Sequence, residues 1–423
     1  MARVLITNAY SARNRGDAAI IHGMIDSLRR HPVFRDAEIR ISTADHPADA
    51  GSYPVPTVAS FHSLKNRVST SPAANLLFFA LVLLPVSLLW AAVWRAAGLD
   101  LPVPAGLRRL MREYRDADMI VAAGGGYLYT RAAIRGNLVL LANVYSFFFA
   151  VLLGKPVVLF AQSIGPFAGR WQARLVRRAL AGVDLVEVRE ELSLKLLEGW
   201  RIETPVRLVA DAAFAFDARR PDGDLGIGGT GVGPIVGVTV RNWFRDRGRQ
   251  QDYERTMAVF VAWLVGEKRA TVVFLPQVTF ADGGDDDRES ARRVAASSGA
   301  TDELRIVEDE LAAAEVKWLC GRMDFFVGTR MHSNIFALAS GVPTLAIAYQ
   351  PKTAGIMAAL GLGDDVLSID GLTAEDLQRA FDALIERAPM IRDRLRSVLP
   401  EIREKAYEAG WLIGEIFAAR GCR

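Results

Sequence analysis

The stretch FFVGTRMHSNIFALASGVPTLAIAYQPK, residues 325–352, decides the fold. Its apolar run Phe325–Val327 predicts a buried strand, Ser333–Ser340 predicts a short helix, and Thr344–Ala348 predicts a second strand after a Gly-Val-Pro turn. A strand, a crossover helix and a second strand are the unit from which parallel sheets are built. The stretch therefore predicts an α/β protein.

The same alternation recurs from end to end of the chain. Further apolar runs of strand length, separated by amphipathic helix-like stretches, lie at Val4–Thr7, Met119–Ala123, Lys155–Ala161, Val206–Ala210, Ile235–Val240 and Thr271–Leu275. Such continuous apolar runs are typical of strands that are covered by helices on both faces of a parallel sheet. We expect the strands to form more than one such sheet, because 423 residues exceed a typical domain.

A change in composition divides the chain in two. Residues 217–234 (DARRPDGDLGIGGTGVGP) are rich in Gly, Asp and Pro and contain no apolar run, so we interpret them as a linker. This predicts two Rossmann-like domains, residues 1–216 and 235–400, that face a cleft. The last helical stretch, Val398–Ala419, predicts a C-terminal helix over residues 401–423 that packs back on the first domain.

Composition excludes several classes of protein. The chain has 51 basic and 48 acidic residues and a net charge of +3, which is too balanced for a nucleic-acid binder. Its two cysteines cannot form a disulfide framework or a four-ligand zinc site, and the N-terminus has no long apolar signal core. We therefore expect a cytoplasmic protein without a nucleic-acid partner.

One segment departs from the soluble pattern. Residues Leu76–Trp94 (LLFFALVLLPVSLLWAAVW) contain no charge and are long enough to cross a bilayer. A single crossing would separate Val4–Thr7 from Met119–Ala123, which should share one sheet. Two interpretations stay open: a helix or hairpin that dips into one leaflet at an anionic membrane surface, or a core helix. We expect Leu83→Asp with Leu88→Asp to release a membrane-bound protein while leaving it folded.

The strongest candidate site lies in the loop Gly328–Asn334. Arg330 can bind a carboxylate or phosphate in bidentate fashion, and His332 can exchange a proton near neutral pH. Both precede a predicted helix, whose N-terminus favours an anion. Lys352, just after the next predicted strand, could reach the same anion as a point charge. Ser333 opens the predicted helix and is a further binding candidate.

Three other loops follow predicted strands and are candidates to line the same crevice. In the first, Asn14 and Asp17 precede a helix that Asp17 could cap, and the nearby Arg13 and Arg15 suit a bound anion. The second and third contribute Gly124, Gly125, Gly126, Gln162 and Ser163. The glycines either let backbone amides approach an anion or form a tight turn into a helix.

Metal and nucleotide-cofactor signatures are weak or missing in the sequence. Residues 285–287 are aspartates that follow two glycines, with Asp282 nearby, a pattern more typical of a solvated loop or helix cap than of a magnesium site. The chain has no Walker A lysine loop, and its first loop lacks the GxGxxG spacing. We expect neither a metal nor a cofactor.

Together these motifs resemble the polysaccharide pyruvyltransferase family. The resemblance rests on NRGDAAI, GGGYL, QSIGPF, VRE-ELS and GTRMHSNIFALASGVP, which occur in this order between residue 14 and about residue 352. It implies a two-domain fold of the GT-B type. It also implies transfer of the enolpyruvyl group of phosphoenolpyruvate to two hydroxyls of one sugar, which forms a pyruvate ketal and releases phosphate.

Carried over by residue, the resemblance implies that Arg330 and His332 lie at the donor site, with Lys352 as a third member. Arg15 and Arg189 are further donor candidates, and Asp17 or Glu190 could accept the hydroxyl proton. The expected partners are phosphoenolpyruvate and a saccharide acceptor, which could be lipid-linked. If the segment 76–94 contacts lipid, we expect the protein at the inner face of the plasma membrane.

Two rival functions remain open from the sequence. One is a GT-B glycosyltransferase with a nucleotide-sugar donor, and the other is a non-catalytic, membrane-associated assembly subunit. The helix after His332 (SNIFALAS) contains no acidic residue, which favours an acidic donor over a neutral sugar. The clustering of Arg, His and Lys at predicted strand ends favours catalysis.

Overall fold

A computed structural model describes residues 1–66, 68–130, 134–223, 225–227, 233–280, 285–299 and 303–421. The chain divides into two compact units. The first contains Met1–Ala12, Ile20–Ala215 and Glu404–Arg423, and the second contains Arg13–Ala19 and Phe216–Arg403. The short segment Arg13–Ala19 thus belongs with residues more than two hundred positions further along the chain.

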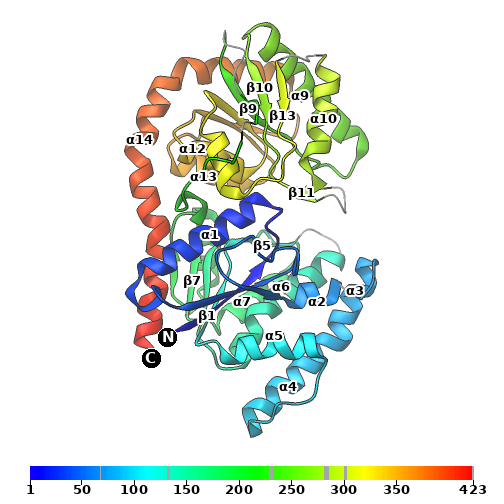
Figure 1. Cartoon of the computed structure of the whole chain (residues 1–423), viewed down its shortest axis with the longest axis vertical. Coiled ribbons are helices and arrows are strands. Elements are labelled where there is room, and N and C mark those ends of the chain that lie inside the picture. The colour runs from blue at the N-terminus through cyan, green and yellow to red at the C-terminus, as the bar shows by residue number, and fades with distance from the viewer. Residues whose placement is uncertain are drawn as a thin grey trace. The chain divides into compact units, whose positions relative to one another are not determined.

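The first unit is built on a parallel sheet with the order β3-β2-β1-β4-β6-β7-β8, and β5 pairs with β6 (Figure 1). The strands are β1 (Arg3–Ala9), β2 (Glu38–Thr43), β3 (Thr57–Ala59), β4 (Met119–Ala122), β5 (Gly125–Leu128), β6 (Val157–Ile164), β7 (Leu185–Val188) and β8 (Val206–Leu208). The helices are α1 (Arg15–Arg30), α2 (Phe61–Asn66), α3 (Pro72–Phe78), α4 (Leu84–Ala97), α5 (Ala105–Asp116), α6 (Ile134–Leu152), α7 (Arg170–Leu180) and α8 (Glu191–Trp200). A π-helical turn, Phe79–Leu83, joins α3 to α4, and short 3-10 turns lie at Pro32–Phe34 and Ala212–Phe214.

The second unit has a parallel sheet of order β13-β10-β9-β14-β15-β16 (Figure 1). Its strands are β9 (Ile235–Thr239), β10 (Thr271–Phe274), β13 (Leu304–Ile306), β14 (Phe325–Gly328), β15 (Thr344–Ala348) and β16 (Val366–Ser368). A small hairpin pairs β11 (Thr279–Phe280) with β12 (Asp285–Asp286). The helices are α9 (Arg247–Gly266), α10 (Asp287–Ser298), α11 (Ala313–Cys320), α12 (Met331–Ala339), α13 (Pro351–Ala359) and α14 (Ala374–Ala419).

The central strands confirm the predicted α/β fold with parallel sheets. All residues of β4, β6 and β14 are buried, as expected for strands that are covered on both faces. Both sheets have the strand order of doubly wound folds, in which ligands bind beyond the carboxyl ends of the strands. The carboxyl edge of each sheet is therefore the place to look for a site.

Several predicted helix boundaries differ from the structure. Helix α12 begins at Met331 rather than Ser333. Helix α1 begins at Arg15 rather than Asp17, because Asn14 is its cap: the Asn14 side-chain oxygen accepts hydrogen bonds from the backbone N–H groups of Gly16 (3.1 Å) and Asp17 (3.4 Å). Asn14, and not Asp17, is therefore the residue that caps this helix.

The C-terminal helix is longer than predicted. Helix α14 begins at Ala374, so it joins the helix-like stretch Ala374–Glu386 to the predicted C-terminal helix. Pro389 and Pro400 each remove a backbone hydrogen bond, but the helix continues through both. The last part of α14 belongs to the first unit, where the backbone N–H of Gly410 donates to the Ser27 hydroxyl at 2.8 Å.

Candidate active site

Cationic side chains follow three strands that are neighbours in the second sheet. Arg241 lies just beyond β9, Arg330 beyond β14, and Lys352 in the first turn of α13 beyond β15. Because these strands are parallel and adjacent, their carboxyl ends present the following loops at one edge of the sheet. This edge of the second unit is the candidate active site.

Arg330 is held in place by two carboxylates. It is the N-cap residue of α12, is buried, and donates through Nη2 to Asp287 at 2.6 Å and to Asp285 at 2.7 Å. Its Nε also donates to Asp287, at 3.1 Å. Burial acts to lower the pKa of the Arg330 guanidinium, but the two carboxylates outweigh it and raise that pKa. Among the described residues, Nη1 has no hydrogen-bond partner, so this one donor is left to face a ligand.

Arg241 is a site residue that sequence reasoning missed. Its guanidinium lies against two aromatic rings, 4.9 Å from the ring centre of Trp243 and 4.5 Å from that of Tyr349. Burial, together with the nearby charge of Arg330, lowers the pKa of Arg241. Two guanidiniums held this close gain stability when an anion binds between them. The available signal was its place immediately after the predicted strand at 235–240.

Tyr349 marks the point where the three cations converge. Burial acts to raise the pKa of its hydroxyl, yet Lys352, Arg241 and Arg330 together lower that pKa below the ordinary value of 10.0. Because all three cations lower the pKa of this phenol, Tyr349 lies close to each of them. The three cations outnumber the two carboxylates that hold Arg330, so the cluster has a net positive charge that suits a small anion.

His332 lies in the first turn of α12, and α1 packs against its ring. A methyl group built on Gly16 would lie 2.3 Å from Nδ1 of His332, so only glycine fits there. The chain before Gly16 is fixed by backbone hydrogen bonds, from Arg15 N–H to the Gln277 carbonyl (2.9 Å) and from Thr279 N–H to the Arg13 carbonyl (3.2 Å). The first turn of α1 is thereby part of the second unit and positions the imidazole.

The remaining candidates from the first loop and the motif have protein partners. Asp17 accepts a hydrogen bond from the Asn14 side chain at 2.8 Å, beside the Gly16 turn. Arg15 is buried and donates to Glu310 at 2.7 Å; burial lowers the pKa of this guanidinium, and Glu310 opposes that shift. Ser333 is fully buried and its hydroxyl donates to the Arg330 carbonyl at 2.6 Å, which fixes the loop rather than facing a ligand.

The predicted residues of the first unit form a separate cluster at the carboxyl edge of its own sheet. Gly124–Gly126 do not turn into a helix; the chain continues as β5, because Gly125 and Leu128 pair with β6. A side chain on Gly124 would meet Ile20 at 3.0 Å and the Phe160 carbonyl at 3.1 Å. The tight approach of β4 to its neighbours explains this glycine without a ligand.

Gln162, Ser163 and Arg189 lie in hydrogen-bond networks of the first unit. Gln162 donates to the Tyr127 hydroxyl at 2.8 Å. Ser163 accepts from Arg189 at 2.8 Å, and Arg189 also binds Asp211 at 2.6 Å with both partners buried. The structure therefore groups Arg189 with Asp211 in the first unit, whereas Arg330, His332 and Lys352 belong to the second.

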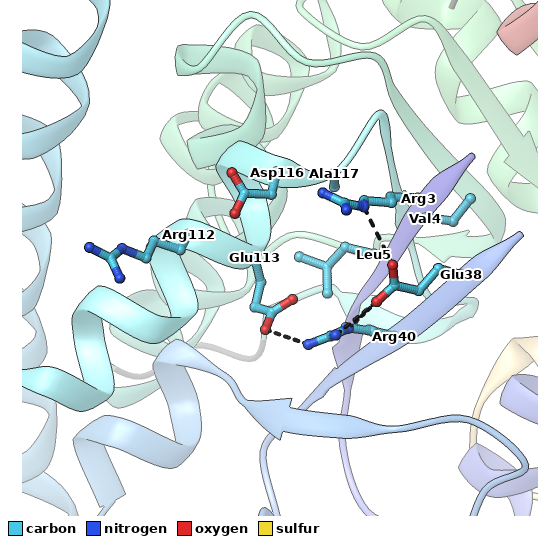
Figure 2. Close-up of a pocket in the computed structure, with 9 residues that line it drawn as sticks. All are labelled: Arg3, Val4, Leu5, Glu38, Arg40, Arg112, Glu113, Asp116 and Ala117. Carbon is cyan, nitrogen blue, oxygen red and sulfur yellow. Dashed lines mark hydrogen bonds and ion pairs between the residues drawn. The ribbon is translucent and has the colours of Figure 1, made fainter. Parts of the chain in front are cut away.

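A charged hollow in the first unit lies at the opposite end of its sheet (Figure 2). It borders Arg3 and Glu38, which begin β1 and β2. Figure 2 shows Arg40 between Glu38 and Glu113, at 2.7 Å and 2.9 Å respectively. Its charges neutralise one another at the amino ends of the strands, so this hollow is a structural ion-pair cluster.

The acidic residues 285–287 form ion pairs with arginines of the second unit. Asp285 and Asp287 bind Arg330, and Asp286 binds Arg288 at 2.7 Å. Asp282 lies outside the described residues. Within the described ranges, no group of three or more His, Cys, Asp or Glu side chains is arranged to hold a metal ion.

The fold, two units that are each built on a parallel sheet, shows which class of protein this is. Solved structures of similar fold include a putative UDP-N-acetylglucosamine 2-epimerase from Listeria monocytogenes (TM-score 0.60, 12% identity, 96% of this chain and 94% of that one). The UDP-GlcNAc 2-epimerase from Neisseria meningitidis matches with TM-score 0.59 at 12% identity, covering 99% and 100% of the chains. The glycosyltransferase SnogD from Streptomyces nogalater matches with TM-score 0.52 at 16% identity, covering 98% and 100%. The chain therefore has a GT-B-like fold.

The family follows from the sequence match. The family model for polysaccharide pyruvyl transferase matches residues 14–351, and the chain belongs to this family. It is also 26% identical, over 440 aligned positions, to the amylovoran biosynthesis protein AmsJ of Erwinia amylovora, covering 99% of this chain and 98% of that protein. The family predicted from the motifs is thus confirmed.

Proposed function

We propose that the protein transfers the pyruvyl group of phosphoenolpyruvate to two hydroxyls of one sugar, in a cell-surface polysaccharide or its lipid-linked precursor. The observation that carries this proposal is geometric: Arg241 lies 4.5 Å from the ring centre of Tyr349 and, like Arg330, reaches Asp285 (4.0 Å and 2.7 Å), while Lys352 follows Tyr349 by three residues. Phosphoenolpyruvate has a carboxylate and a phosphate on a three-carbon frame, so its binding needs several cations within one small site. We place the reaction in the cytoplasm, in line with the expectation from the sequence.

The residues divide into binding and proton-transfer roles. Arg241 and Lys352 bind the phosphate and carboxylate, while the Nη1 donor of Arg330 completes the charge-assisted contacts. Asp285 and Asp287 keep the Arg330 fork in one orientation, so that it need not reorganise during the reaction. His332, held by Gly16, is the acid.

In the proposed sequence, His332 donates a proton to the methylene carbon of phosphoenolpyruvate. The adjacent carbon becomes oxocarbenium-like and is attacked by the first sugar hydroxyl, whose proton passes to a base, for which Asp17 is the candidate. The bond from that carbon to the phosphate oxygen then breaks, and the cations stabilise the leaving phosphate. The second hydroxyl attacks the same carbon and loses its proton, which completes the ketal.

The proposal is tested by phosphate release from phosphoenolpyruvate in the presence of saccharide acceptors, including lipid-linked glycans. We expect acceptor-dependent release that His332→Ala abolishes through kcat and Lys352→Ala weakens mainly through KM for the donor. Lys268→Ala is the matched control, because Lys268 follows the end of α9 and pairs with Asp382 at 2.5 Å. Turnover of a UDP- or GDP-sugar without phosphoenolpyruvate consumption would instead assign the chain to the glycosyltransferases.

A further inference from the structure

The apolar segment that the sequence singled out is a helix with two different faces. It runs from Pro72 to Ala97 through α3, the π-helical turn and α4. One face is buried in the core of the first unit; its residues recur at helical spacing and are Leu76, Phe79, Leu83, Ser87 and Trp90. The Ser87 hydroxyl lies 2.6 Å from that of Tyr145, and Trp90 donates to Asp100 at 3.0 Å. The helix is thus anchored to the folded unit.

The opposite face is apolar and exposed. Leu77, Leu81 and Leu89 are 56%, 71% and 60% exposed, and they follow one another along the helix. From Pro72 to Trp94 the sequence contains no charged residue. A surface helix that faces water carries polar side chains on its outer face, so this face is suited to an apolar environment. In Figure 1, α4 projects beyond the other elements of the first unit.

The sheet rules out a single crossing of a bilayer by this helix. β1 precedes the helix and β4 follows it, and the two strands pair directly, Val4 with Met119 and Leu5 with Ile120. Both ends of the segment therefore return to the same folded unit. With one face in the core and both flanks in one sheet, the helix lies along an apolar surface rather than through it.

The arginine and aromatic side chains at the end of this helix indicate which kind of apolar surface it contacts. Trp90 and Trp94 stack at 5.9 Å, and the guanidinium of Arg115 lies 4.9 Å above the Trp94 ring. Arg95, Arg109 and Arg112 are exposed nearby on α4 and α5, and Arg112 also pairs with Asp100 at 2.6 Å. Residues 95–116 contain five arginines and three acidic residues. An apolar stripe that ends in the partly exposed Trp94 and in arginines matches the hydrocarbon, interface and headgroups of an anionic bilayer.

We propose that the exposed face of Pro72–Ala97, formed by Leu77, Leu81 and Leu89, docks on an anionic phospholipid bilayer. Arg95, Arg109 and Arg112 then contact the headgroups. This docking does not depend on pyruvyl transfer, and it would place the enzyme at the surface where lipid-linked acceptors lie. The test suggested by the sequence needs correction, because Leu83 is only 4% exposed and lies in the core, so Leu83→Asp would unfold the protein.

The test is flotation of the full chain with vesicles of phosphatidylcholine alone or of phosphatidylcholine with phosphatidylglycerol. The wild type is expected to float with anionic vesicles and to be released by high salt. Leu81→Asp with Leu89→Asp should lower the bound fraction about tenfold or more, because both side chains enter the hydrocarbon boundary. Val259→Asp with Met390→Asp is the control, since these residues are 54% and 61% exposed on other helices.

Circular dichroism and phosphate release with a water-soluble acceptor show whether the Leu81 and Leu89 variant remains folded. Loss of flotation with an unchanged circular dichroism spectrum supports the proposal, whether or not pyruvyl transfer proves to be the reaction. Flotation that is unchanged by the Leu81 and Leu89 substitutions overturns it. A second result would also overturn it: the wild type does not float with vesicles but forms a dimer, and the Leu81 and Leu89 substitutions dissociate that dimer. The exposed face would then bind a second copy of the chain.

Discussion

Replacing Gly16 by alanine tests how the site positions its acid. The new methyl would lie 2.3 Å from Nδ1, 2.6 Å from Cγ and 2.9 Å from Cβ of His332. The nearest of these distances is about 1 Å short of an ordinary 3.4 Å contact, so the imidazole must move by a comparable amount. A displacement of about 1 Å at a reacting group costs on the order of a hundredfold in rate.

The assay is kcat for acceptor-dependent phosphate release, and we expect it to fall about a hundredfold while KM for phosphoenolpyruvate changes little. Gly199→Ala is the control. Gly199 is also helical, and no atom lies within 4 Å of the place that its new methyl would occupy, so this variant should be active and about 0.5–1 kcal/mol more stable.

A double-mutant cycle separates positioning from general damage. In a His332→Ala background the Gly16 substitution has no imidazole to displace, so we expect it to cost almost nothing further. Equal losses in both backgrounds would refute the reasoning, because they would show that Gly16 does not act through His332.

Two further predictions concern binding and stability. Arg241→Ala should raise KM for phosphoenolpyruvate about tenfold or more, by loss of a charge-assisted contact, whereas Arg249→Ala, an exposed arginine that pairs with Asp370, should leave it unchanged in steady-state kinetics. Burial raises the pKa of Glu187 well above its ordinary 4.5, so the folded chain holds a proton that the unfolded chain releases. The wild type therefore loses up to about 1.4 kcal/mol of stability per pH unit as pH rises from that ordinary value toward the folded pKa. Glu187→Gln removes this loss. Urea unfolding should therefore show that the substitution raises the free energy of unfolding more at pH 8 than at pH 5. An equal increase at both pH values would contradict a neutral Glu187.

The fold could be predicted because buried parallel strands leave a clear mark in the sequence. The run Val157–Ala161 is apolar without alternation, and all eight residues of β6, Val157–Ile164, are buried. Helix ends were harder to place, since they depend on which side chain caps the helix, as Asn14 does for α1. The continuity of α14 through Pro389 and Pro400 was not predicted for a similar reason, since it depends on the packing of residues such as Ile391 and Leu395.

Only part of the candidate site could be predicted from the sequence. Arg330, His332 and Lys352 lie in one strand–helix–strand stretch, so the sequence could assign them to the same edge of the second sheet. The approach of Gly16 to His332 joins residues far apart in the sequence and has no local signal. The same holds for the pairing of Arg15 with Glu310, which satisfies within the protein a charge that the sequence suggested was meant for a ligand.

The most direct test of the proposed function follows the donor carbon itself. Isotope-labelled phosphoenolpyruvate is incubated with the protein and a saccharide acceptor, and the products are examined by nuclear magnetic resonance. The proposal predicts that the labelled carbon appears as the quaternary carbon of a ketal on the sugar, with one phosphate released for each ketal formed. Labelled donor that stays intact or ends as free pyruvate, while a nucleotide sugar is consumed in the same mixture, would contradict it.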